Sequence, residues 1–362
     1  MERMGDIVES IANEKNLNIE DVKQKVRLAF INCAKELFGE DYNYDVEFSS
    51  NQKNIKVYHK ILVVKNDDER VDNNHFMALS EAKKLNKEIS VGDEIKYYID
   101  FSDFGRTASA ILSRELGYHI QQLVEETNYK HYQEKMDEII FGTVIRVDEW
   151  ETTYLEIDDA KVYMPRKNRI KGENFEVGDI VRAVIRKIYL DKQGIRIEIS
   201  RTSPKFLEAL LKVQVPEIED GSVIIQKCAR IPGERAKVAL SATRPNIDPV
   251  GATVGVKGVR INAVSKELNN ENIDVIEYSP KPEVLIARAM APAIVNSVTI
   301  KDMIATVHIN SEQKSKAIGK NGINIRLAST LCGHRIELVE ESSDKKDTKT
   351  GLENLKELFG DI

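Results

Sequence analysis

The first third of the chain begins with apolar residues at helical spacing. Val22, Val26 and Phe30 recur every four residues behind Asn18, a residue type that favours helix N-caps. Gly39 follows the last apolar position and is a typical helix stop. The pattern therefore predicts a helix between Asn18 and Gly39.

After this helix the hydrophobic period shortens to that of strands. Strands are predicted at residues 44–48, 55–64 and 94–101, with a short helix at 80–85. From residue 105 to about residue 138 the sequence contains no proline and predicts one long helix, polar on most faces, as is typical of a connector. We predict a small α+β domain over residues 1–104 and a connector helix over residues 105–138.

Beyond the predicted connector, the pattern changes to short strands separated by glycine-containing and polar turns. Five short strands in about 65 residues are typical of an OB-type β-barrel, which we assign to residues 139–202. An antiparallel sandwich without a nucleic-acid role is the alternative that this pattern leaves open. The strands are predicted at residues 139–147, 153–157, 161–164, 180–190 and 195–200.

The segment after the predicted barrel contains an internal repeat. Gly-Val-Lys-Gly at residues 255–258 aligns with Gly-Lys-Asn-Gly at residues 319–322, at an offset of 64 residues. Around each copy the pattern predicts helix, strand, strand, helix, Gly-x-x-Gly turn, helix and strand. We predict two α-β-β-α-α-β modules over residues 203–280 and 281–340, the second opening with a helix at 282–294.

A Gly-x-x-Gly turn between two helices brings bare backbone close to whatever lies against it. Glycine lets a sugar-phosphate strand approach, and the N–H groups that begin the next helix attract phosphate oxygens. A lysine in each turn adds a point charge. One such turn also occurs in ordinary helix corners, but two in the same element order indicate binding of single-stranded nucleic acid. The predicted RNA-binding residues are Gly255, Val256, Lys257, Gly258, Gly319, Lys320, Asn321 and Gly322.

The predicted barrel gives a second, weaker indication of nucleic-acid binding. Aromatic and basic residues are interleaved there, and exposed rings can stack on bases while arginine and lysine follow the backbone. In a barrel this small, some of the rings must fill the core instead. The candidates are Phe141, Arg166, Lys167 and Arg169.

The composition excludes several classes of protein. With 362 residues, 41% hydrophobic and 31% charged, the chain has enough apolar residues for several modest cores. No apolar run is long enough for a membrane span and no signal peptide is recognisable, so we expect a cytoplasmic protein without membrane attachment. The three cysteines and six histidines have no metal-binding spacing, and common catalytic motifs are missing. We therefore expect no disulfide, metal, cofactor or enzymatic activity.

Charge is distributed unevenly along the chain. The formal net charge is −6 overall, −6 for residues 1–130 and +3 for residues 203–340. This division favours a protein-facing N-terminal region and an anion-facing second half, although ordinary solvated surface accounts for the same charges.

Several short motifs together resemble the NusA family of bacterial transcription termination/antitermination factors. The most specific are Asp-Pro-Val-Gly-Ala at residues 248–252, Ala-Ile-Gly-Lys-Asn-Gly at 317–322 and Ile-Arg-Leu-Ala-Ser at 325–329. Phe-Gly-Arg at 104–106 and Ile-Ser-Arg-Thr at 199–202 support them. The resemblance implies a multidomain α+β protein: an N-terminal α+β domain with a long connector helix, an OB-type five-stranded β-barrel and two tandem KH modules of type II.

The resemblance also implies a function in transcription elongation. It implies binding of RNA polymerase through the N-terminal domain and of nascent single-stranded RNA through the barrel and KH modules, modulating pausing, termination and antitermination. Other antitermination factors are further expected partners, and we expect a monomer. Arg260 and Arg326, which follow the two turns, join the candidate RNA contacts. A protein of ribosome assembly or RNA turnover is the alternative, and an enzyme with attached RNA-binding modules is a second one.

The last segment, residues 341–362, combines a polar run with a short apolar pattern. Leu352, Leu355, Leu358 and Phe359 would share one face of a helix. We expect a short amphipathic C-terminal helix that either packs on its own protein or docks in a groove of a partner.

Overall fold

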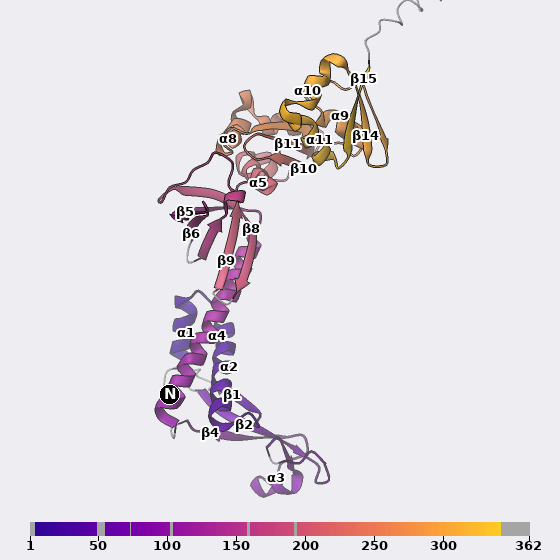
Figure 1. The fold of residues 1–362 in the computed structure, drawn as a ribbon. Coiled ribbons are helices and arrows are strands. Elements are labelled where there is room, and N and C mark those ends of the chain that lie inside the picture. Colours follow the sequence, from indigo (N-terminus) through magenta and orange to yellow (C-terminus); the bar gives the residue numbers. More distant parts are fainter. Residues whose placement is uncertain are drawn as a thin grey trace, which may run out of the picture. The chain divides into compact units, whose positions relative to one another are not determined.

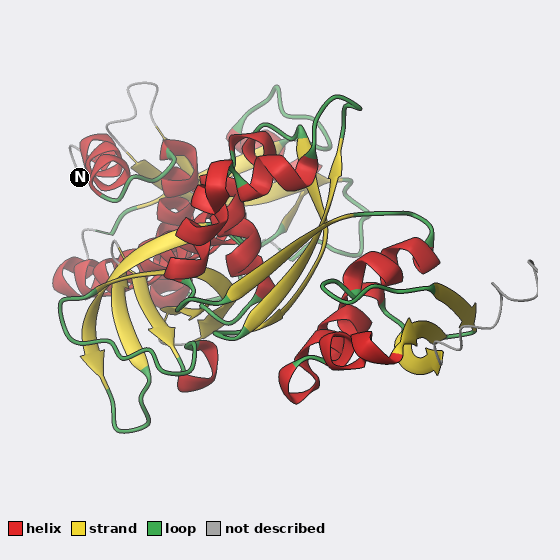
Figure 2. Cartoon of the chain, turned by 90° about the horizontal axis from the view of Figure 1, so that it is seen from above, coloured by secondary structure: helices red, strands yellow, loops and turns green. Residues whose placement is uncertain are grey.

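A computed structural model describes residues 4–48, 55–72, 74–101, 104–157, 160–191 and 194–341 of the chain, and the expected C-terminal helix lies outside these residues. The chain divides into two compact units, the first reaching to Glu134 and the second beginning at Lys135. Helices and strands are interspersed in both (Figures 1 and 2). Among the described helices, none combines the length and the apolar character needed to cross a bilayer.

The first unit is built around a four-stranded sheet. Strand β2 pairs antiparallel with β1 and β4 and parallel with β3. The predicted helix caps are confirmed, because Asn18 accepts a hydrogen bond from the Glu20 N–H and the Gly39 N–H donates to the Lys35 carbonyl. The elements are α1 (Met4–Glu14), α2 (Ile19–Phe38), β1 (Tyr44–Phe48), β2 (Ile55–Val64), β3 (Phe76–Ala78), α3 (Leu79–Leu85), β4 (Glu94–Ile99) and α4 (Gly105–Glu134).

The long helix α4 belongs to the core of the first unit. Ala108, Ile111 and Leu123 are buried in one cluster with Val26 and Phe30 of α2. The prediction of a helix reaching about residue 138 is wrong at its end, since α4 stops at Glu134. The buried residues form a narrow stripe among many polar ones, which is why the sequence alone indicated a connector.

The second unit begins with a closed five-stranded barrel of order β5-β6-β7-β9-β8. Closure confirms the predicted OB-type barrel and excludes the open sandwich. Val144, Leu155, Val162 and Ile197, which alternate with outward-facing residues along their strands, fill the interior. The strands are β5 (Ile139–Val147), β6 (Thr153–Ile157), β7 (Ala160–Met164), β8 (Ile180–Asp191) and β9 (Gly194–Ser200), with the short 3-10 helix η2 (Arg166–Asn168) after β7.

Two modules of the predicted α-β-β-α-α-β order follow the barrel. The first contains α5 (Pro204–Gln214), the short α6 (Pro216–Glu219), β10 (Val223–Ile231), β11 (Arg235–Ala242), α7 (Pro249–Val254), η3 (Val256–Gly258), α8 (Val259–Glu267) and β12 (Asn272–Glu277). The second contains α9 (Pro282–Ala289), β13 (Ser297–Lys301), β14 (Ile304–Asn310), η4 (Ser311–Gln313), α10 (Lys314–Ile318), η5 (Lys320–Gly322), α11 (Ile323–Cys332) and β15 (Arg335–Glu341).

Both modules have the same sheet topology. The first two strands pair antiparallel and the last strand adds in parallel to the middle one, as β10-β11-β12 and β13-β14-β15. Helix α9 is shorter than predicted and ends at Ala289. Pro292, which cannot continue a helix, lies three residues further on, and the apolar run beyond Ala289 had concealed this end.

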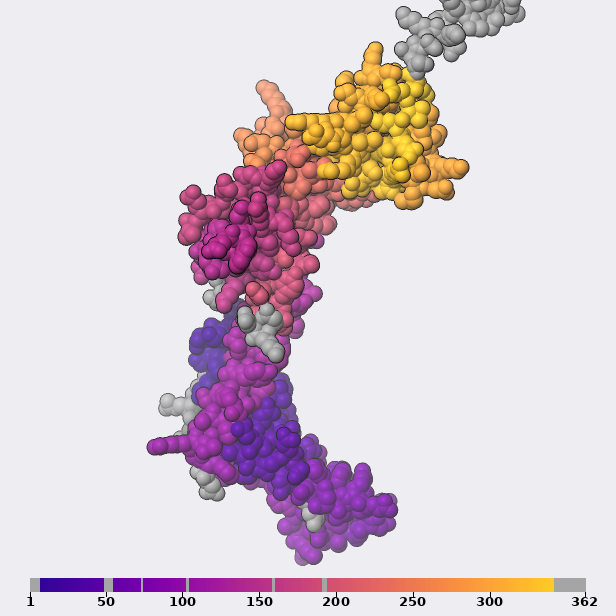
Figure 3. Space-filling model, viewed as in Figure 1, coloured from indigo at the N-terminus to yellow at the C-terminus, as the bar shows by residue number. Residues whose placement is uncertain are grey.

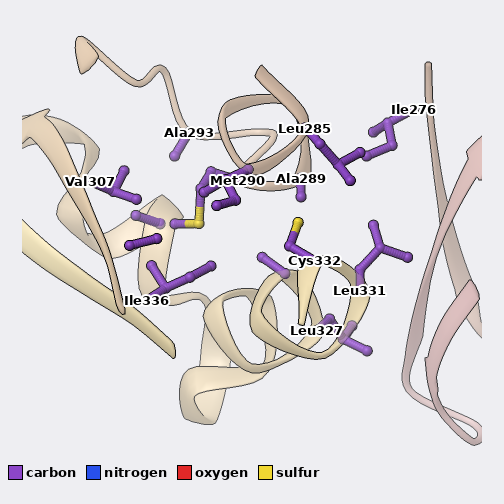
Figure 4. Close-up of a cluster of buried hydrophobic side chains, with 14 of the residues drawn as sticks. Ile276, Leu285, Ala289, Met290, Ala293, Val307, Leu327, Leu331, Cys332 and Ile336 are labelled. Atoms are coloured by element: carbon purple, nitrogen blue, oxygen red, sulfur yellow. The ribbon is translucent and has the colours of Figure 1, made fainter. Parts of the chain in front are cut away.

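The two modules share one hydrophobic core. Ala229, Ala239 and Ile276 of the first module's sheet are buried in one cluster with helix residues of the second module, among them Leu285 and Leu331. Figure 4 shows Ile276 beside Leu285, with Leu331 on the neighbouring helix. In the space-filling view the orange first module lies directly against the yellow second module (Figure 3). The modules therefore form one body rather than two units on a linker.

Candidate nucleic-acid interface

The two Gly-x-x-Gly turns have nearly the same backbone conformation. Gly255 has φ 74° and ψ 171°, and Gly319 has φ 73° and ψ 172°. The third position is left-handed in both turns, with φ 53° at Lys257 and φ 54° at Asn321. A left-handed glycine follows directly in each case. The repeat in the sequence thus specifies one turn geometry, which two glycines make accessible.

The two glycines of each turn serve different purposes. A Cβ on Gly255 would lie 2.9 Å from the Arg260 side chain, and a Cβ on Gly319 would lie 2.7 Å from Asn324. The first glycine is therefore needed for internal packing. A Cβ on Gly322 would meet no atom within 4 Å, whereas one on Gly258 would lie 3.2 Å from Asn262 Nδ2, so the surface at the last glycine is open in the second turn.

Arg260, predicted to contact RNA, is engaged within its own module. Its Nη1 donates hydrogen bonds to the Ala252 carbonyl at 2.6 Å and to the Glu217 carboxylate at 2.8 Å. At the matching position of the second module, the buried Asn324 donates from Nδ2 to the Ala317 carbonyl at 3.1 Å. Both side chains join the helices on either side of the turn. RNA contact by Arg260 stays a prediction.

The exposed side chains of the turns differ in sequence position. Lys257 and Lys320 are both exposed, but Lys257 is the third residue of its turn and Lys320 the second. The residue matching Lys320 is Val256, which is 83% exposed. Arg326 on α11 is also exposed, and it forms no ion pair with another residue that the structure describes. Each turn therefore presents one lysine, placed differently on the same backbone.

On the barrel, Phe141 is an exposed aromatic residue with a cationic neighbour. Its ring is 57% exposed, and the Arg182 guanidinium lies 5.5 Å from the ring centroid. The two residues are register partners on β5 and β8. A base stacked on this ring would have the arginine beside it.

The basic cluster after β7 divides into buried and exposed members. Glu151 pairs with both Arg166 and Arg169, and the Arg169 side chain is only 11% exposed. Arg169 therefore has its charge neutralised inside the structure. Arg166 and Lys167 remain on the surface, where they are accessible to a phosphate.

A groove on the barrel brings Arg196 together with aromatic and basic residues that interleave earlier in the sequence. Its volume is about 610 Å³, and Tyr154, Tyr163, Arg146 and Arg196 are among its lining residues. The Arg146 guanidinium lies 4.2 Å from the Tyr154 ring centroid, and that of Arg196 lies 5.9 Å from the Tyr163 ring. Arg196 comes from β9, far along the chain, and reaches the groove only because β9 pairs with β7.

Buried ion pairs join the barrel to the first module. Arg201, at the end of the barrel, pairs with Glu173 at 2.7 Å and with Glu267 of α8 at 3.0 Å. Arg230 of β10 pairs with Glu271 at 2.9 Å, and both side chains are fully buried. Arg230 also donates from Nη1 to the Arg201 carbonyl at 2.7 Å. Removing one partner of such a pair costs about 3–5 kcal/mol, so the barrel and the first turn are held in fixed geometry.

Among the residues that the structure describes, no three His, Cys, Asp or Glu side chains come together as metal ligands. The turns and the barrel present open backbone, lysines, exposed aromatic rings and arginines, groups that suit the binding of nucleic acid.

Comparison with known proteins agrees with this arrangement. Family models match in three places, as NusA N-terminal domain at residues 3–127, NusA-like first KH domain at 201–278 and NusA-like second KH domain at 282–346. A protein of Helicobacter pylori strain J99, named transcription termination/antitermination protein NusA, is 37% identical and aligns with 99% of this chain and 100% of its own. The chain belongs to the NusA family.

Two further NusA proteins align over most of both chains. That of Thermus thermophilus is 33% identical over 93% of this chain and 90% of its own. That of Bacillus subtilis is 29% identical over 94% of this chain and 91% of its own. The resemblance to the NusA family drawn from the Gly-x-x-Gly motifs is thereby confirmed, together with the fold class.

Proposed function

We propose that this protein is a transcription termination and antitermination factor of the NusA family that holds nascent single-stranded RNA while bound to RNA polymerase. The observation that carries the RNA part is the pair of nearly identical Gly-x-x-Gly turns, each with one exposed lysine, and the open glycine surface of the second turn. Glycine backbone and lysine together suit a sugar-phosphate strand without base preference. The predicted contacts are the eight turn residues and Arg326, with Arg260 beneath the first turn.

The barrel extends this RNA surface. Phe141 with Arg182, the groove of Tyr154 and Tyr163, and the exposed Arg166 and Lys167 give stacking rings and cations on one closed barrel. Because Arg201 joins the barrel to the first module, the two surfaces keep a fixed position relative to each other.

The first unit is the proposed polymerase-binding part. It has its own hydrophobic core, separate from the cores of the second unit, and residues 1–130 carry a net charge of −6. An acidic surface of this kind favours a basic protein surface over RNA. We place the protein in the cytoplasm as a monomer without catalytic activity, which acts with polymerase and other antitermination factors.

The RNA proposal is tested at Gly322. In Gly322→Asp a Cβ and a carboxylate occupy the position proposed for phosphate, so affinity for a single-stranded 12-nucleotide RNA should fall by at least about ten-fold. Fluorescence anisotropy measures it. The matched control is Gly333→Asp, because Gly333 is also left-handed and has equally open surroundings but lies at the far end of α11. Equal affinities for both variants would contradict the assignment.

The polymerase proposal is tested by capture on immobilised core RNA polymerase. Residues 1–134 should be retained and residues 135–362 should bind RNA in a separate titration. If only RNA binding is found, the surfaces are correct and the process is another one, such as ribosome assembly or RNA turnover. RNA incubated with the full chain and magnesium should stay intact.

A further inference from the structure

The second Gly-x-x-Gly turn opens into a groove whose opposite wall belongs to the first module. The groove has a volume of about 290 Å³. Gly319, Lys320 and Ile323 line it from the second module, and Glu234, Arg235 and Asn272 line it from the start of β11 and β12. We call it the inter-module groove. It exists because the shared core holds the two modules against each other.

The wall from the first module is poorly suited to phosphate. Arg235 donates two hydrogen bonds to the Asp274 carboxylate, at 2.7 and 2.8 Å, so its charge is neutralised. The buried Lys237 pairs with the same carboxylate at 2.9 Å. The exposed Glu234 adds a negative charge that repels a phosphate. This wall therefore offers hydrogen-bonding groups without the net positive charge that a phosphate requires.

Two polar side chains on this wall are uncommitted. Within the described part of the chain, neither the Glu234 carboxylate nor the Asn272 amide has a side-chain hydrogen bond or ion pair. A carboxylate and an amide on one wall, with the apolar Ile323 among the residues of the other, resemble the sites at which proteins bind the edge of an unstacked base. The opposite wall, with Gly319 and Lys320, has the open backbone and the cation that suit the sugar-phosphate strand.

The floor of the groove holds an unsatisfied acceptor. Asn324 is 1% exposed and donates from Nδ2 to the carbonyls of Met290, Lys316 and Ala317. These three acceptors fix the orientation of the amide. Its Oδ1 is buried and has no hydrogen-bond donor within the described structure. Because this atom is buried, a bound base does not reach it, and recognition in the groove depends on the exposed Glu234 and Asn272.

We propose that the inter-module groove binds one RNA base, and that it selects guanine. Guanine presents two adjacent N–H donors on its Watson–Crick edge, which a carboxylate accepts in a bidentate pair. Glu234 is the acceptor and Asn272 supplies the amide donor for the guanine carbonyl. Adenine, cytosine and uracil each offer Glu234 a single donor group on that edge. The inference rests on the proposed RNA binding and adds sequence selectivity to the second turn.

Selection from a pool of RNAs with twelve randomised positions tests the proposal, using the full chain. The wild type should enrich guanine at one position, and Glu234→Ala should lose about ten-fold of that preference while the base profile elsewhere is unchanged. Asn272→Ala should weaken the same position. The control is Glu283→Ala, since Glu283 is an exposed glutamate of the second module outside the groove.

The possible results separate the two proposals. If the wild type binds RNA and Glu234→Ala leaves every positional preference unchanged, the groove does not read a base and the proposal is overturned. If the wild type binds no RNA, the proposed function itself is overturned. Thermal unfolding of each variant shows whether a loss comes from misfolding, and a lost preference with an unchanged melting temperature supports the groove.

Discussion

Beneath Gly255 of the first turn lies Arg260, a charged side chain paired with Glu217, whereas beneath Gly319 of the second turn lies the neutral amide of Asn324. The backbones of the two turns differ by only one degree in φ and one degree in ψ at these glycines. Their surroundings differ far more, because the first module supplies one wall beside the second turn. A repeated motif thus fixes the backbone conformation of a turn, while the neighbouring module determines which additional chemical groups lie beside it.

The largest difference in stability between the two turns is expected when the first glycine of each turn is replaced. A Cβ on Gly319 would lie 3.0 Å from the Asn324 backbone nitrogen, whereas the three atoms nearest to a Cβ on Gly255 belong to the side chain of Arg260. We expect Gly319→Ala to cost about 2–3 kcal/mol of unfolding free energy and Gly255→Ala about 1 kcal/mol. Urea unfolding of residues 135–362 followed by circular dichroism measures both. Equal losses would mean that the second turn relaxes as easily as the first.

Exchanging the exposed second residues of the two turns tests how much the lysine contributes to RNA binding. Lys320→Val should weaken RNA binding a few-fold and flatten the dependence of log affinity on log salt by about 0.7, the contribution of one phosphate on a single strand. Val256→Lys should change both quantities in the opposite direction. Anisotropy titrations between 50 and 200 mM salt measure the slopes. Lys266→Val, an exposed lysine of α8 away from the turn, should leave the slope unaltered.

The smallest effect is expected at the left-handed third residue. Asparagine tolerates this conformation better than lysine does, so Lys257→Asn should stabilise the protein by about 0.5 kcal/mol and Asn321→Lys should destabilise it by a similar amount. The thermal unfolding midpoints of the two variants should shift in opposite directions. A shift of the same sign in both would show that contacts of the side chain, rather than backbone preference, dominate at this position.

Much of the fold could be predicted from the sequence because its signals are local or repeated. The helix from Ile19 to Phe38 is defined by its caps, and the barrel strands by short alternating runs. The three-residue strand β3 was missed, since so short a segment becomes a strand only by pairing with β2. The packing of α4 on α2 was not predicted for the same reason, because a narrow apolar stripe does not show by itself which helix it packs against.

The candidate interface could be predicted where its residues lie close together in the sequence. The two turns are visible as Gly-x-x-Gly, and both were found. The barrel groove and the inter-module groove join residues from distant strands, such as Tyr163 with Arg196 and Glu234 with Lys320, and no local pattern connects them. The partners of Arg260 could not be predicted either, since its bonds to Glu217 and Ala252 depend on how the helices of the module pack.

The core around Ile276 also makes the affinity of the second unit depend on the length of the RNA. Since Leu285 and Leu331 pack against the first module, the two turns stay a fixed distance apart in the second unit. An RNA held at one turn presents its next nucleotides to the other at an effective concentration set by strand length rather than by a flexible linker. Strands too short to span the gap gain nothing from the second site, and affinity rises in one step at the length that first bridges it.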